Sequence, residues 1–483
     1  MRAESVGAST GGRETRRLSV ARGFGSVKWP SGEPWVVSDL QRAAAFAGVG
    51  LLSLAAPAVT RPTPRTAAVL AATPFLAVAA YALFFAERGR TFELFARRGD
   101  YEEGRLLGLG GFALAGAGVA ALAAGSSLPA TVFVMSVFAL TGGRVVATLA
   151  GRSLSHEFLL MAAFSVGALG WALVGGYAAL VVEARRVVTT SPALAPTLLV
   201  FLAATAAIGA GLLRAMLFER DDPLVVVSVT LLLWLFVELD VTVPPSRLGV
   251  GLAVTVLLGY VAYALGTASV AGMLTGVLLA LFAIVLGGYG WFALLVTFFG
   301  VGGLAAKYRY DEKAARGIAE ENEGARGSGN VLANSAAALG AIIAFAASQG
   351  VYPAAAPAFR FAYAGAVAAA LADTLSSEFG GLFDGPRLVT TLEPVDPGTD
   401  GAVTWQGELF GLLGAGIIAG LAAISFDLGP LATGVIVLGG FAGMTVDSLL
   451  GATVEGGRVG NQGVNFLATL AGAVACGVLA TLL

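Results

Sequence analysis

Long apolar runs alternate with short polar connectors along most of the chain. A transmembrane helix needs about 20 mostly apolar residues, and the chain offers about fifteen such runs, within a range of about 13 to 17. They lie near residues 43–59, 66–86, 106–124, 129–150, 158–182, 193–217, 223–243, 248–266, 269–287, 289–306, 331–349, 359–375, 408–425, 431–450 and 464–482. The alternation expected of an outer-membrane barrel is missing. The pattern predicts an all-α, polytopic integral membrane helix bundle.

Composition supports a membrane protein and excludes several chemistries. Charged residues make up 12% of the 483 residues, about half the share of a soluble domain. The single cysteine, Cys476, and the single histidine, His156, exclude a disulfide framework and histidine-rich metal sites. No lysine precedes Ser or Thr, so a Walker-type phosphate loop is absent. A net charge of −2 argues against a nucleic-acid partner.

Three regions follow from the spacing of the runs. Residues 1–42 are polar and basic and lack the apolar core and cleavage site of a signal peptide, so we expect a disordered cytoplasmic N-terminus. Residues 43–222 predict an N-terminal transmembrane domain with short connectors. Residues 223–483 predict a C-terminal transmembrane domain, in which the polar connectors are longer.

By the positive-inside rule, the basic N-terminus places the start of the chain on the cytoplasmic side of the cell membrane. Connectors that follow even-numbered spans then return to the cytoplasm. These connectors include the three polar segments of the second half, 307–330, 376–407 and 451–463. We therefore expect these segments to share the cytoplasmic face.

The first of these segments is rich in cations and amides. Lysine and arginine spaced over helical turns are good phosphate ligands, and its glycines allow the backbone to approach an anion. The candidate phosphate-binding residues are Lys307, Arg309, Lys313, Arg326, Asn330 and Asn334. The alternative is a solvated helix in a loop.

The second segment begins where Asp373 and Glu378 close an apolar run, with Ser376 and Ser377 between them. Carboxylates inside a membrane are costly and are functional candidates by default. A loop rich in glycine, proline and aspartate follows, and its backbone donors and hydroxyls suit phosphate oxygens. The candidates in this loop are Thr399, Asp400, Gly401 and Thr404. The alternative is an ordinary turn.

The third segment echoes the second. Asp447 ends an apolar run, Glu455 follows, and Asn461 and Asn465 lead into the last run. Two carboxylates with amide and hydroxyl oxygens form the kind of site that Mg²⁺ prefers. From spacing alone, three interpretations stay open. They are a metal–phosphate site formed by Asp373 and Asp447, structural caps or ion pairs, and a pathway for ions or protons.

Six phrases in fixed order then resemble the domain of unknown function 92 family over about residues 226–483. They are KYRYDEKAARG, EGARGSGNVLAN, ADTLSSEFG, PGTDGAVTWQGELFG, DSLLGAT and NQGVNFLAT. That family includes the plant phytyl-phosphate kinase and an uncharacterised vertebrate membrane protein, and the resemblance implies a helical domain of the inner membrane.

Two more distant resemblances add detail. Residues 373–414 are similar to the signature of CTP-using phospholipid cytidylyltransferases. The run from Gly143 to Arg152 resembles the dolichol and phytol kinase family, but Arg144 stands where that family has an acidic residue. The first half is therefore expected to be a degenerate kinase-like half or a lipid-facing scaffold.

These observations and resemblances lead to one main hypothesis, an isoprenoid-lipid phosphate kinase or a related CTP- or ATP-dependent transferase acting on a prenyl (phytyl-like) phosphate. Asp373 and Asp447 would hold Mg²⁺, with Glu378 and Glu455 as further ligands or bases. The cationic side chains and the 399–404 loop would bind the nucleotide and the phosphoryl oxygens. The alternatives are a membrane transporter or lipid flippase, and a noncatalytic membrane scaffold.

The predicted topology can be tested by cysteine labelling. In a Cys476→Ser background, single cysteines placed in 307–330, 376–407 and 451–463 should react with a membrane-impermeant maleimide only after the membrane is opened, because all three segments face the cytoplasm. A cysteine in the connector near residue 427, on the opposite face, is the control. Labelling of any of the three segments in intact cells would contradict a shared site.

Overall fold

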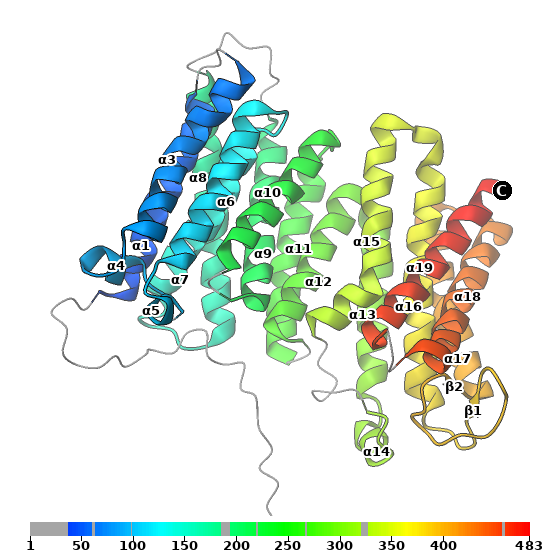
Figure 1. The fold of residues 1–483 in the computed structure, drawn as a ribbon. Helices are drawn as coiled ribbons and strands as arrows, with labels where there is room; N and C mark the ends of the chain where they lie inside the picture. The colour runs from blue at the N-terminus through cyan, green and yellow to red at the C-terminus, as the bar shows by residue number, and fades with distance from the viewer. Residues whose placement is uncertain are drawn as a thin grey trace, which may run out of the picture. The chain divides into compact units, whose positions relative to one another are not determined.

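The computed structural model describes residues 37–59, 63–97, 99–184, 194–218, 221–265, 268–319, 327–455 and 459–483, and these residues form one compact unit (Figure 1). Within these ranges, 14 helices are long and apolar enough to cross a membrane. A further predicted run forms helix α10 (Asp222–Glu238), which has 17 residues. All the predicted runs are therefore helical, and the all-α membrane fold is confirmed.

The membrane-length helices are α1–η1–α2 (Asp39–Ala58), α3 (Pro64–Phe84), α6 (Leu107–Gly125), α7 (Ala130–Ala150), α8 (Glu157–Ala184), α9 (Pro196–Met216), α11 (Pro245–Leu265), α12–η3 (Val270–Gly287), α13 (Tyr289–Lys307), α15 (Ser328–Val351), η5–α16 (Pro353–Gly380), α17 (Trp405–Phe426), α18 (Pro430–Val454) and α19–η6 (Asn461–Leu482). The remaining elements are short and lie in connectors. They are α4 (Arg90–Phe95), α5 (Asp100–Glu103), α14 (Tyr310–Ala315), and the antiparallel strands β1 (Arg387–Leu388) and β2 (Ala402–Val403).

Helix starts follow capping chemistry as well as hydropathy. The first helix begins at Asp39, four residues before the apolar run, because Ser38 and Gln41 form a capping box. Thr63 is the N-cap of α3, which begins at Pro64, and its side chain accepts a hydrogen bond from the amide of Thr66. Polar residues ahead of an apolar run therefore belong to the helix. Residues 1–36 of the expected disordered N-terminus lie outside the described residues.

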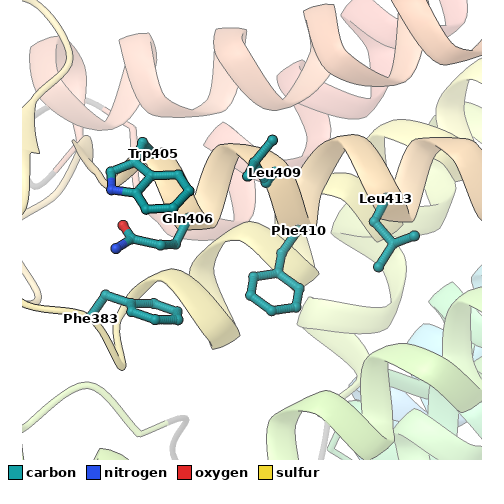
Figure 2. Close-up of a pocket in the computed structure, with 6 residues that line it drawn as sticks. All are labelled: Phe383, Trp405, Gln406, Leu409, Phe410 and Leu413. Atoms are coloured by element: carbon teal, nitrogen blue, oxygen red, sulfur yellow. The ribbon is translucent and has the colours of Figure 1, made fainter.

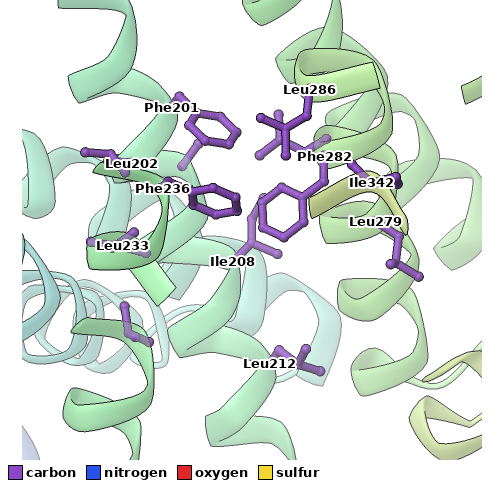
Figure 3. Packing of buried hydrophobic residues seen from close by; sticks show 14 of the residues in the cluster. Phe201, Leu202, Ile208, Leu212, Leu233, Phe236, Leu279, Phe282, Leu286 and Ile342 are labelled. Atoms are coloured by element: carbon purple, nitrogen blue, oxygen red, sulfur yellow. The ribbon is translucent and has the colours of Figure 1, made fainter. Parts of the chain in front are cut away.

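A continuous apolar core joins the two halves of the chain. Phe201 of α9, Phe236 of α10 and Phe282 of α12 have ring centroids 5.0 to 6.0 Å apart, and Ile342 of α15 belongs to the same cluster (Figure 3). Helix α10 packs against α6, α7 and α9. It therefore lies with the N-terminal helices, although the change in connector length assigns it to the C-terminal domain.

The C-terminal helices gather around α16. This helix packs against α13, α15, α17, α18 and α19, and much of it is buried, including every residue from Tyr363 to Ala372. In Figure 1, the loop with β1 and β2 and the short helix α14 lie at one end of these helices. Strand β2 also contacts α18, so the described parts of the three polar segments singled out in the sequence lie at one end of the bundle.

Arg144, the residue that departs from the kinase-like pattern, takes part in a buried ion-pair cluster. Its guanidinium donates to Asp222 at 2.8 and 3.0 Å, and Arg97 donates to the same carboxylate at 2.5 Å. The Asp222 side chain is only 3% exposed. Arg97 lies in the connector before α6, so the cluster attaches this connector to helices α7 and α10. Arg144 thus has a structural role here.

Replacing Asp222 by Asn should destabilise the bundle by about 3–5 kcal/mol, because it leaves buried guanidinium charge without its counter-ion. Thermal unfolding in detergent would measure the loss. Asp240→Asn is the control: Asp240 is exposed at the other end of the same helix, with φ of 47°, a conformation that Asn tolerates. Equal stability of both variants would refute the role of this cluster.

Candidate functional site

Close packing between α16 and α18 sets the geometry of the site. Gly440 faces Ala368 and Gly443 faces Ala369, and a Cβ atom at Gly440 would lie 2.9 Å from that of Ala368. Small residues at such crossings let helix backbones approach closely in lipid. The residue numbers of these contacts increase together along α16 and α18, so the two helices are parallel.

The two aspartates lie four residues beyond the contact between Ala369 and Gly443, one on each helix. The Asp447 side chain makes a hydrogen bond with that of Asp373. The Oδ1 atom of Asp447 is buried and accepts no hydrogen bond from the residues that the structure describes. Two carboxylates this close repel each other unless they share a proton or a cation. The fold therefore brings together Asp373 and Asp447, which were paired from the similarity of the second and third polar segments.

The glycine-rich loop docks onto the end of α18. Gly401 has φ of +75°, and a Cβ atom there would lie 2.5 Å from the Ala452 nitrogen and 2.6 Å from the Ser448 oxygen. At the end of the loop, Thr404 donates to the Gly380 carbonyl at 3.3 Å and caps α17. The loop thus connects the ends of α16, α17 and α18, one or two turns from the aspartates.

Glu455 is the C-cap residue that follows α18, beside this loop. Burial raises the pKa of its carboxyl, and the nearby charges of Asp400 and Asp447 raise this pKa further. Asp400 itself is exposed. The carboxylates of the loop and of α18 therefore add negative potential at the mouth of the site, which favours a bound cation.

Lys313 of α14 and Glu378 of α16 form a buried ion pair. The Lys313 ammonium donates to Glu378 Oε2 at 2.5 Å and to the carbonyls of Ala305 and Ala306 at 2.9 and 2.7 Å. An ammonium has three donors, so these contacts use all of them. Lys313 is only 1% exposed. The structure therefore makes this pair a clamp between α13, α14 and α16, not a phosphate ligand with a catalytic base.

The other predicted cations differ in exposure. Lys307 ends α13 and is exposed, and Arg309 is exposed in a left-handed conformation and pairs with Glu312. Arg316, a further cation of this segment, pairs with Asp384 at 3.2 Å. Arg326 lies outside the described residues. Lys307 and Arg309 are thus open to solvent at the end of the bundle that carries the loop.

The amides and hydroxyls mostly make local hydrogen bonds. These bonds join Asn334 to the Asn330 carbonyl at 3.0 Å, Asn465 to Asn461 Oδ1 at 3.1 Å, Ser377 to the Thr374 carbonyl at 3.2 Å, and Thr399 to the Asp396 carbonyl at 2.7 Å. A Cβ atom at Gly329 would meet the Gln462 side chain, so the starts of α15 and α19 are neighbours. Ser376 lies where α16 meets α17, its carbonyl 3.0 Å from a Cβ built on Gly407.

The sequence reading missed Glu408, one turn into α17. It lies three residues before Gly411, which packs against Met444 and the Ala372 carbonyl. These contacts place Gly411 at the level of the aspartate pair and Glu408 one turn closer to the loop. Glu408 is the glutamate of the phrase PGTDGAVTWQGELFG, so the sequence did contain a carboxylate at the start of this apolar run. Across the part of the chain that the structure describes, no three His, Cys, Asp or Glu side chains form a metal-binding group.

Comparison with known proteins places these segments in a family. The family described as integral membrane protein DUF92 matches residues 253–473. An uncharacterized membrane protein of Methanocaldococcus jannaschii is 37% identical over 193 residues, which are 39% of this chain and 75% of the relative. An uncharacterized membrane protein of Synechocystis is 35% identical over 205 residues, 41% of this chain and 76% of the relative.

The chain is also similar to a plant protein. Protein VTE6, chloroplastic, of Arabidopsis thaliana is 32% identical over 170 residues, which are 35% of this chain and 50% of that protein. The similarity thus spans half the length of the plant relative. No solved structure matches this chain. The acidic pair and the docked loop both lie within the residues that the family matches.

The docking of the loop can be tested with two glycines of the same conformation. Gly401→Ala and Gly385→Ala both place a Cβ atom at φ of +75°, but only Gly401 has neighbours, since Gly385 has nothing within 4 Å. Both variants should pay about 1–2 kcal/mol for the left-handed conformation. Gly401→Ala should also loosen the loop, which limited proteolysis between residues 385 and 404 would detect. Equal protease sensitivity would refute the packing on α18.

Proposed function

Because this chain belongs to the DUF92 family of integral membrane proteins, we propose that it is a prenyl-phosphate kinase of the membrane. It would transfer the terminal phosphoryl group of CTP or ATP to an isoprenoid-lipid monophosphate at the cytoplasmic face. The observation that carries the proposal is the pairing of Asp373 with Asp447 beside the loop that ends at Thr404. The resemblance to a family that includes the plant phytyl-phosphate kinase supports the substrate class.

The reaction needs positioning and charge stabilisation more than covalent chemistry. An oxygen of the lipid phosphate attacks the terminal phosphorus of the nucleotide. The bond from that phosphorus to the bridging oxygen breaks, and a new phosphoanhydride bond forms. The products are a prenyl diphosphate and a nucleoside diphosphate, so no oxidant or reductant is involved.

The acidic pair fits Mg²⁺. Mg²⁺ sites of nucleotide enzymes commonly use one or two carboxylates, and phosphate oxygens and water complete the shell. Asp373 and Asp447 would supply the carboxylates, and the buried Asp447 Oδ1 is an acceptor that a cation would satisfy. Bound there, Mg²⁺ would neutralise part of the charge of the nucleotide phosphates.

Other residues would bind and orient the phosphates. Lys307 and Arg309, exposed at the end of α13, and Arg326 are proposed to contact the nucleotide. The loop from Thr399 to Thr404 would offer backbone N–H groups to phosphoryl oxygens. The remaining polar side chains at this end would line the path of the nucleotide to the site. They are Asn330, Asn334, Ser376, Ser377, Asn461 and Asn465. Lys313 and Glu378 act as positioning residues that hold α14 on α16.

The depth of the acidic pair favours this reaction over a transporter or lipid flippase. Helices α16 (Ala356–Gly380) and α18 have 25 residues each, and each aspartate lies seven residues before the end of its helix. That is about 10 Å along the axis, whereas the middle of the helix lies about 19 Å from either end. Binding sites of secondary transporters lie near the bilayer midplane. A carboxylate pair closer to the helix ends suits a reaction between a lipid phosphate and a soluble nucleotide.

The proposal predicts that the two aspartates act as one unit. Asp373→Asn or Asp447→Asn should each lower turnover of phytyl monophosphate with CTP or ATP at least about 100-fold, and the double variant should be hardly worse, because residues that act together are strongly non-additive. Mg²⁺-dependent nucleotide binding, turnover and thermal stability would be measured on the purified wild type, the two single variants and the double variant.

Asp427→Asn provides the control, since Asp427 is exposed at the far end of α17. It should keep wild-type turnover. Normal nucleotide binding in both single variants would refute the metal site. Roughly additive losses of stability, with turnover retained, would instead assign the aspartates a structural role.

A further inference from the structure

An apolar groove runs along the outer face of α17. Its volume is about 390 Å³, within the range of about 300–1,000 Å³ typical of small-molecule sites. It is lined by Phe383, Trp405, Gln406, Leu409, Phe410 and Leu413. Figure 2 shows Phe383, Trp405 and Gln406 at one end of the groove and Leu413 at the other.

The groove lies on a different face of α17 from the one that packs inside the bundle. Gly407, Gly411 and Gly414 pack against α16, whereas Leu409 and Leu413 are 55% and 54% exposed. Helix α17 therefore separates the groove from the packed interior. A molecule in the groove could enter it sideways from the bilayer.

Aromatic rings form the wall of the groove. Phe410 stacks on Phe379 with centroids 4.5 Å apart, and Phe383 lies 6.5 Å from Phe410. Phe410, which lines the groove, is thus packed between two other aromatic rings. Together with Leu409 and Leu413, these rings leave a hollow into which an apolar chain could fit.

The two ends of the groove differ in chemistry. Trp405 and Gln406 are the first two residues of α17, where N–H groups have no partner within the helix and the helix dipole favours an anion. Gln406 is the one polar side chain in the lining. From Trp405 to Leu413 the groove extends about 12 Å along the helix. An anionic head at the loop end with an apolar chain along the helix would match both ends.

We propose that this groove holds the head-proximal part of the isoprenoid chain of the lipid phosphate substrate. The inference rests on the proposed function, because that function supplies an anionic lipid whose head must reach the loop and the aspartate pair. The groove begins where the loop ends, at the Thr404 cap. Since it is shorter than the hydrocarbon core of about 30 Å, the rest of the chain would remain in the bilayer.

A matched pair of substitutions tests the groove. Leu409→Trp fills it, whereas Leu412→Trp adds the same side chain at an exposed position of α17 outside the lining. We expect Leu409→Trp to raise the KM for phytyl monophosphate at least about tenfold, through loss of several buried methylene contacts. Mg²⁺-dependent nucleotide binding should stay unchanged in both variants. Equal KM values for the two variants would overturn the proposal.

Photocrosslinking separates failure of the groove from failure of the kinase proposal. A prenyl monophosphate with a diazirine near its head should label α17 of the full-length protein, and phytyl monophosphate should compete. Labelling at the groove without phosphoryl transfer would overturn the kinase proposal and support the groove as a lipid-phosphate site. Transfer with labelling elsewhere would overturn the groove alone. Equal competition by bilayer phospholipid, or crosslinks between two copies of the chain, would also overturn it.

Discussion

The close contact between α16 and α18 is the constraint on which the candidate site depends. Lipid provides no hydrophobic drive that would press helices together, so packing of small residues must hold them. Gly440 and Gly443 meet Ala368 and Ala369, and α17 and α19 pack against the same pair through further glycines. A side chain at Gly443 would push α16 and α18 apart one helical turn before the aspartates. The high glycine content of this chain thus has a direct consequence for the chemistry.

Charge inside the bundle falls into two kinds. Asp222 with its arginines, and Lys313 with Glu378, are buried opposite charges that hold connectors to helix ends. Removing one partner of such a pair leaves a buried charge and strongly lowers the stability of the fold, so these pairs hold the connectors in place. Asp373 and Asp447 instead bring two like groups together, and one oxygen of Asp447 is buried without a protein donor among the described residues. Only this second arrangement calls for an additional cation or proton.

Helix α17 links the two parts of the proposed chemistry. Its glycine face packs against α16, and its outer face forms the groove between Trp405 and Leu413. The Thr404 cap fixes where the helix starts and ties the loop to the end of α16. A lipid could therefore reach the polar end of the bundle from the membrane while a nucleotide reaches it from solvent, as a reaction across the interface requires.

The sequence by itself determined the membrane fold, because hydropathy over about 20 residues depends only on local composition. It also identified both aspartates, since a carboxylate at the end of an apolar run is conspicuous without any structure. Only the tertiary structure decided which charges meet. Lys313 and Glu378 looked like a phosphate ligand and a base, but they are 65 residues apart in sequence and pair when α14 folds against α16. The role of Arg144 and the position of Glu408 were likewise set by neighbours on other helices, and hydropathy along one chain carries no information about which helices become neighbours.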